Sequence, residues 1–205
     1  MLSEDFLLLL ASLFGISFIT NATPFFGASY TLIATAELIS SGFSPGNFFV
    51  FVLITGLGAT LAKIVLYSGA LGLRKELTKN KNIRLLHEWL LKRSFFVALS
   101  ITAFVPALPL DDYIYIGAGA NKAKLAPMLG VTFVAKLAKS AVEIFLEFNG
   151  IVDISAITRN IFALSSLEFS IILSVFFVIL GIVLYKLDWE SILRKTGILK
   201  ANQKV

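Results

Sequence analysis

The sequence predicts an all-α integral membrane protein made of two inverted repeats, each a re-entrant helical hairpin followed by a long transmembrane helix, with additional N- and C-terminal helices. Three observations support this prediction. Of the 205 residues, 57% are apolar and 15% are charged, whereas a soluble domain carries about 25% charged residues. Two prolines, Pro24 and Pro106, interrupt strongly apolar segments. A shift of 82 residues places Pro24 on Pro106 and Pro45 on Pro127, so the two halves read alike.

The apolar pattern predicts these elements in order: a helix over residues 3–20, a broken segment over 22–44, a long helix over 48–73, a basic stretch over 74–93, a second broken segment over 94–120, a long helix over 127–148, a span over 166–188 and a basic tail over 189–205. Because about 20 residues cross the hydrocarbon core, we expect one membrane domain, residues 1–205. Glu4 and Asp5 stand where a signal peptide carries positive charge, which favours a retained helix that either spans the membrane or lies on it.

Proline and glycine residues mark the points where the two broken segments turn. We assign this role to Pro24 and Gly27 in the first segment and to Pro106 and Pro109 in the second. Backbone that leaves a helix inside a bilayer must be buried in protein or line a water-filled cavity. Two such interruptions in corresponding halves of a chain indicate a transport site.

Lysine and arginine residues determine the expected orientation. Residues 74–93 and the C-terminal tail are rich in both and should therefore face the cytoplasm. The long helix 127–148 then runs outward, and the span 166–188 returns. It follows that segment 94–120 enters and leaves from the cytoplasmic side, and segment 22–44 from the outer side. We expect a multi-pass protein of the plasma membrane.

Four ionisable residues in the apolar segments are candidates for transport or coupling: Asp111, Asp112, Glu37 and Lys63. An ionised side chain at mid-bilayer costs about 2.5–3.5 kcal/mol on insertion scales, so such residues are functional candidates. Because adjacent carboxylates repel each other, Asp111 and Asp112 could form a proton or cation coupling site. The alternative is that they stabilise a helix N-terminus, where acidic residues are favoured. Glu37 and Lys63 are expected to pair with each other, in a structural or a transport role.

A second candidate set lies on the helix over 127–148. Lys136, Lys139, Glu143 and Glu147 recur at intervals of three and four residues and therefore share one face. They could form a self-neutralising network. However, Lys136 has no obvious carboxylate on its own helix, so we favour contact with an anionic headgroup. Ser29, a polar residue of the first broken segment, joins Lys136, Lys139 and Glu143 as a candidate headgroup-binding residue.

The order of these segments resembles the DedA or VTT-domain family, also called SNARE-associated Golgi proteins. The resemblance covers residues 15–150 and rests on a proline-containing hairpin, a long glycine-rich helix ending near Tyr67, a basic loop, Phe104-Val-Pro-Ala-Leu-Pro, and Gly117-Ala-Gly119. It implies two opposed re-entrant hairpins. It also implies movement of lipids or lipid-linked phosphates between leaflets, including the recycling of polyprenyl phosphates.

The chain departs from the family pattern in both hairpins. Ala103 and Pro109 stand where many bacterial members have arginines on either side of the Phe-x-Pro motif. Gly27 replaces the second proline of a Pro-x-Pro motif, and Ser29 or Tyr30 stands near the position of the usual carboxylate. The resemblance is therefore to a divergent branch.

The resemblance therefore favours a transport protein of the flippase or scramblase type, for a lipid or lipid-linked phosphate with an anionic headgroup. Two alternatives remain open: a proton-coupled transporter of a small ion or solute, and a membrane scaffold without transport. The chain has no cysteine, and no Ser/His/Asp set, zinc motif or phosphate-binding loop is recognisable, so we expect no enzymatic activity, cofactor or metal site. The basic loop and tail suit anionic lipids better than nucleic acid, and the sequence is compatible with a homo-oligomer.

Overall fold

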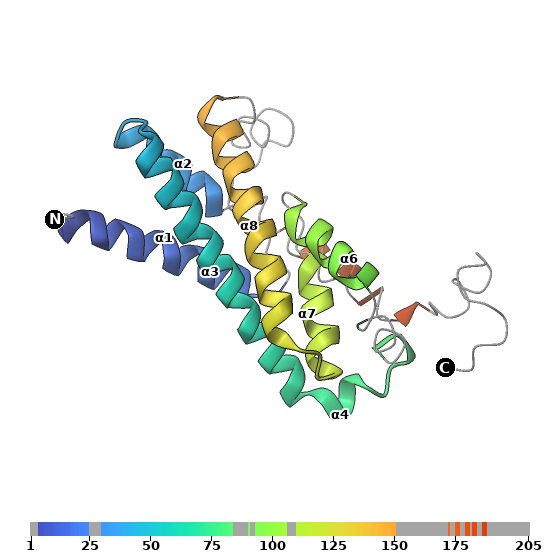
Figure 1. Ribbon diagram of the computed structural model, residues 1–205. Helices are drawn as coiled ribbons and strands as arrows, with labels where there is room; N and C mark the ends of the chain where they lie inside the picture. Colours follow the sequence, from blue (N-terminus) through green and yellow to red (C-terminus); the bar gives the residue numbers. More distant parts are fainter. Residues whose placement is uncertain are drawn as a thin grey trace.

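The computed structural model describes residues 4–24, 30–83, 90, 93–105 and 110–150, together with nine positions between 172 and 187. Within these residues the chain is helical and contains no strand, which confirms the all-α part of the predicted fold class (Figure 1). The helices are α1 (Glu4–Ala22), α2 (Tyr30–Ser40), α3 (Pro45–Gly72), α4 (Arg74–Leu77), α6 (Arg93–Phe104), α7 (Leu110–Ala120) and α8 (Leu125–Phe148).

Helix length distinguishes two long helices, α3 and α8, from three short ones, α2, α6 and α7. α3 has 28 residues and α8 has 24; at 1.5 Å per residue both exceed the roughly 30 Å of a hydrocarbon core. α2, α6 and α7 have 11, 12 and 11 residues, which is about 17 Å each, or half of that thickness. Two helices, α1 and α3, are both long and apolar enough to cross a membrane.

Local sequence explains where the long helices begin. Ser44 caps α3, because its hydroxyl accepts a hydrogen bond from the Asn47 backbone N–H at 3.0 Å. Pro45 opens the same helix, where a missing N–H costs nothing. Pro127 likewise lies in the first turn of α8, which begins at Leu125. The two helices therefore start two to three residues before the predicted positions 48 and 127.

The first break falls at the predicted position of Pro24 and Gly27, but the helices on its two sides differ from those predicted. α1 ends at Ala22 and α2 begins at Tyr30, so the segment 22–44 contains one helix and not both arms of a hairpin. Pro24 follows the end of α1 and, having no N–H, cannot extend the helical bonding. The helix predicted over 3–20 is therefore the element that precedes this break. Gly27 and Ser29 lie outside the described residues.

The second broken segment is divided into α6 and α7, as predicted for 94–120. Pro106 and Pro109 fall between these helices and lie outside the described residues. Most of the span predicted over 166–188 and the tail over 189–205 also lie outside them.

α3 and α8 lie side by side in the centre of the molecule and run in opposite directions (Figure 1). α1 packs against α3, and α6 packs against α8. The short helices cross between the halves, because α2 packs mainly on α8 and α7 mainly on α3. α1 also contacts α2, and α6 contacts α7. The contacts of α1, α2 and α3 thus resemble those of α6, α7 and α8, except that α2 also contacts α3.

Two glycines allow other helices to approach the backbone of α3 closely. A Cβ atom on Gly58 would lie 2.7 Å from the carbonyl oxygen of Phe14 on α1. A Cβ atom on Gly119 of α7 would overlap the carbonyl oxygen of Tyr67 on α3. Because both obstacles are backbone atoms, they cannot move aside in the way a flexible side chain can. These contacts fix α1 and α7 on α3.

The long helices are apolar on the outside and charged on the inside. On α3, Lys63 is 1% exposed whereas Val65 is 47% exposed. On α8, Lys136 is 2% exposed whereas Val134 is 67% and Phe145 is 54% exposed. This distribution is the reverse of that in soluble proteins, where lysine is almost never fully buried.

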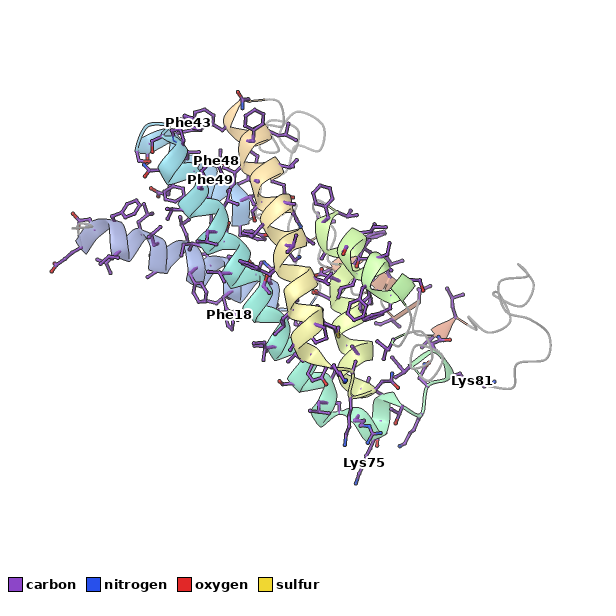
Figure 2. The ribbon with its side chains drawn as sticks, viewed as in Figure 1. Phe18, Phe43, Phe48, Phe49, Lys75 and Lys81 are labelled. Atoms are coloured by element: carbon purple, nitrogen blue, oxygen red, sulfur yellow. The ribbon has the colours of Figure 1, made fainter. Side chains whose placement is uncertain are left out.

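The two ends of the bundle differ in the side chains they present. Phe43, Phe48 and Phe49 gather at the N-terminal end of α3, whereas Lys75 and Lys81 lie at the opposite end (Figure 2). The ring centroids of Phe43 and Phe148 are 5.0 Å apart, which joins the start of α3 to the end of α8. We call these the aromatic end and the basic end.

We predict that Gly119→Ala destabilises the protein by about 1–3 kcal/mol, because the added methyl group forces α7 away from the α3 backbone. Thermal unfolding in detergent measures the effect. Gly69→Ala on α3 is the matched control, since a Cβ atom there meets nothing within 4 Å. Equal midpoints for the two variants would show that α7 does not pack on α3 in this way.

Candidate transport site

Buried ion pairs join α3, α7 and α8. Asp111 in the first turn of α7 has its Oδ2 atom 3.1 Å from Lys63 Nζ on α3 and 3.0 Å from Lys136 Nζ on α8. Lys63 Nζ also donates a hydrogen bond to Asp112 Oδ1 at 2.5 Å. All four side chains are at most 2% exposed. We call Lys63, Asp111, Asp112 and Lys136 the central charge network.

The central charge network lies about half-way along the bundle. Lys136 is near the middle of α8, which runs from Leu125 to Phe148, and the two aspartates stand at the N-terminal end of α7, next to the second break. Two lysines and two aspartates make the network formally neutral. Pairing of this kind offsets the several kcal/mol that burial of each ion costs.

Polar side chains continue from the network along one face of α8 toward the aromatic end. Lys139 Nζ is 3.9 Å from Glu143 Oε1, a looser contact than those of the network. Further along, Glu147 accepts hydrogen bonds from the hydroxyls of Thr31 and Thr35 on α2, at 3.0 and 2.7 Å. The line of charges therefore ties α2 to α8.

An apolar cluster lies on each side of this polar region. Toward the basic end it contains Leu66, Leu99, Tyr115 and Met128. Toward the aromatic end it contains Leu13, Leu38, Phe51, Val52 and Ile144. The central charge network is thus enclosed between two apolar layers, where water does not compete for the charges.

Three buried polar atoms beside the network have neither a hydrogen-bond partner nor an ion-pair partner within the part of the chain that the structure describes. They are the hydroxyls of Tyr30 and Ser140 and the Oδ1 atom of Asp111. Tyr30 is 5% exposed and Ser140 is fully buried. The Tyr30 hydroxyl lies near Ser140 across the contact between α2 and α8, outside the geometry of a good hydrogen bond, and Glu143, Asp111 and Glu147 are in its neighbourhood. Buried groups in this condition are rare in folded proteins and require an explanation.

The structure brings together most of the residues predicted from the sequence. Asp111, Asp112, Lys63 and Lys136 form the network, and Lys139 and Glu143 adjoin it. Both interpretations of the two aspartates have support, since they lie in the first turn of a helix and are also buried. Their expected mutual repulsion is offset by the two lysines.

The predicted pair of Glu37 and Lys63 is wrong. Lys63 binds both aspartates of α7, whereas Glu37 is only half-buried and contacts the Ser40 hydroxyl at 3.4 Å. The reason is that α7 approaches α3 more closely than α2 does. Glu37 therefore lies outside the central charge network.

Sequence reasoning missed four hydroxyl-bearing residues of the site: Tyr30, Thr31, Thr35 and Ser140. Ser140 follows Lys136 by four residues, so it shares the charged face of α8, and that spacing could have identified it. The three residues of α2 carry no such signal, because only the packing of α2 on α8 places them there.

Comparison of the chain with models of protein families, with curated proteins and with solved structures finds no match. The functional argument therefore rests on the geometry of the site.

We predict that Lys63→Met destabilises the protein by about 3–5 kcal/mol, because it removes the ammonium group that lies between two buried carboxylates. The double variant Lys63→Met with Asp112→Asn should recover part of this loss, since it removes one charge of each sign. Denaturant unfolding in detergent measures all variants. Lys75→Met, on the exposed α4, is the control; a loss no larger than that of this control would contradict the ion pairs.

Proposed function

We propose that this chain is an integral membrane transport protein that moves a lipid or a lipid-linked phosphate between the leaflets of the plasma membrane. The observation that carries the proposal is the central charge network. Its four charges are buried beside a broken helical segment, on helices whose outer faces are apolar. Ionisable groups inside a membrane bundle mark the pathways of substrates and ions.

The outer surfaces of the long helices support the location in a membrane. Large apolar side chains such as Phe49, Val65, Val134 and Phe145 are 47% to 69% exposed. Exposure of this extent on every side of a helix pair would cost a soluble protein free energy, but lipid solvates it. The separation of aromatic and basic ends fits the same location (Figure 2). Lysines favour the cytoplasmic side of a membrane.

The resemblance between the contacts of the two halves supports an inverted repeat with two opposed re-entrant hairpins. In this proposal α1 and α2 form one hairpin and α6 and α7 the other, while α3 and α8 are the long helices that follow them. The short helices α2 and α7 are each about half a membrane in length. Each contacts the long helix of the other half. Such an arrangement is consistent with a divergent branch of the DedA or VTT-domain family.

The lysines of α8 support an anionic headgroup as the substrate. Lys136 and Lys139 lie on the same face, and within the described chain Lys139 has only Glu143 at 3.9 Å as a partner. A protein scaffold would gain little from this arrangement, because buried ion pairs are often no more stabilising than apolar residues of the same size. A transporter of small solutes driven by protons through Asp111 and Asp112 is the alternative. It is less favoured because both carboxylates are already neutralised by lysines.

Reconstituted vesicles that contain a fluorescent phosphatidic acid test this function. We predict that the protein accelerates exchange of the labelled lipid between leaflets, measured by chemical quenching of the outer leaflet. Lys136→Ala should slow the exchange about tenfold, which corresponds to 1.4 kcal/mol of lost stabilisation in the transfer step. Lys75→Ala should leave the rate unchanged.

A neutral fluorescent lipid in the same vesicles provides the second arm of this experiment. Lys136→Ala should affect it less than the anionic lipid, since the lysine acts through charge. Equal rates in protein-containing and empty vesicles would refute lipid transport. Proton-dependent solute uptake without lipid exchange would establish the alternative function.

The orientation has its own test, because the chain has no native cysteine. Ser41→Cys follows α2, and Lys124→Cys precedes α8; both positions are exposed. We predict that a membrane-impermeant thiol reagent labels position 41 in intact cells and position 124 only after permeabilisation. Labelling of both positions from the same side would contradict the opposed orientation of α3 and α8.

A further inference from the structure

Four hydrogen-bond donors converge beside the central charge network. Lys136, Lys139 and Ser140 lie within one turn of α8, and the Tyr30 hydroxyl of α2 lies near Ser140. Asp111 and Glu143, which are the partners of Lys136 and Lys139, both lie near the same hydroxyl. The four donor groups therefore lie along the contact between α2 and α8.

Several of these donors have few or no partners among the described residues. Each ammonium group carries three N–H donors, and each hydroxyl adds one. Lys136 meets one oxygen at 3.0 Å, Lys139 meets one at 3.9 Å, and the two hydroxyls lie near each other without a hydrogen bond of good geometry. Tyr30 and Ser140 are at least nine-tenths buried. A buried hydroxyl donor without a partner is costly, so these two groups favour a ligand that supplies acceptor oxygens.

We propose that Tyr30, Ser140, Lys136 and Lys139 form a binding site for a tetrahedral phosphate group, in which Glu143 occupies Lys139 until the phosphate replaces it. A terminal phosphate has three strongly accepting oxygens and negative charge, so it matches two ammonium groups and two hydroxyls. The inference rests on the proposed function for one point only, namely that the phosphate belongs to a lipid.

Glu143 is suited to the role of an exchangeable partner. Its contact with Lys139 is the longest ion pair of the site, and its side chain is 14% exposed while those of the two aspartates are at most 2% exposed. It can therefore move toward the aromatic end when an anion arrives. Asp111 is held by two lysines and stays in place.

Isothermal titration calorimetry of the full chain in detergent tests the site. The probes are dioctanoyl phosphatidic acid, whose phosphate is terminal, dioctanoyl phosphatidylcholine, whose phosphate is a diester next to a cation, and inorganic phosphate. We expect phosphatidic acid to bind more tightly than phosphatidylcholine. Tyr30→Phe and Ser140→Ala should each weaken its binding about tenfold, the effect of one lost hydrogen bond to a charged group.

Matched controls separate loss of a ligand contact from loss of structure. Tyr67→Phe and Ser17→Ala each remove a hydroxyl that is bonded within the protein, to the carbonyl oxygens of Ala123 and Thr55. They should lower the unfolding temperature without changing affinity for phosphatidic acid. Tyr30→Phe and Ser140→Ala should leave the unfolding temperature of the ligand-free protein unchanged or raise it, since no described residue loses a hydrogen bond of good geometry.

The outcomes distinguish this inference from the proposed function. Two results would overturn the site even if vesicles show lipid exchange. One is wild-type affinity for phosphatidic acid in both Tyr30→Phe and Ser140→Ala. The other is that none of the probes binds. Binding of phosphatidic acid that depends on both hydroxyls supports the site even if exchange fails. Binding of inorganic phosphate with the same dependence also supports it, and would assign the site to free phosphate and count against a lipid substrate.

Discussion

Pairing of Lys63 with the two aspartates at the start of α7 is the interaction on which the structure depends. A lysine or an aspartate that faces lipid alone is costly, so the three side chains must meet wherever they lie in the chain. Their meeting fixes the N-terminal end of α7 against α3, and Lys136 adds α8 to the same point. The break between α6 and α7 therefore falls at half-height of the bundle, where an unbroken helix could not place both aspartates among the lysines.

The two ends of the bundle are held by different forces. At the basic end, the Gly119 backbone lies against the Tyr67 backbone, the Tyr67 hydroxyl donates to the Ala123 carbonyl at 2.7 Å, and Arg74 Nε donates to the Ala120 carbonyl at 3.1 Å. At the aromatic end, α2 is tied to α8 through Thr31, Thr35 and Glu147. The backbone contacts at the basic end resist separation of the helices. The side-chain hydrogen bonds at the aromatic end can be exchanged one at a time. The loosely paired Glu143 lies on this exchangeable side of the network.

Which residues are buried could be inferred from the sequence, but their partners could not. The cost of charge in an apolar segment is a local property, so Asp111, Asp112, Lys63 and Lys136 were recognisable as site residues. The partner of Lys63 depends on which short helix packs against α3. That choice is made by the close approach at Gly119, a contact between residues far apart in the sequence, and it excluded Glu37. Tyr30 was missed for the same reason, because only the crossing of α2 onto α8 gives its hydroxyl a place beside Ser140.

The central claim is that the charge network lies at mid-membrane, shielded by protein from the lipid around it. Val134 tests it most directly, since this residue is 67% exposed and lies on α8 within one turn of Lys136. A nitroxide attached through Val134→Cys, in a chain without other cysteines, reports its depth in a lipid bilayer by power-saturation EPR. The account predicts strong relaxation by oxygen and little by a water-soluble nickel chelate, as at a bilayer centre. Strong relaxation by the nickel chelate would place this level of α8 in water and contradict the account.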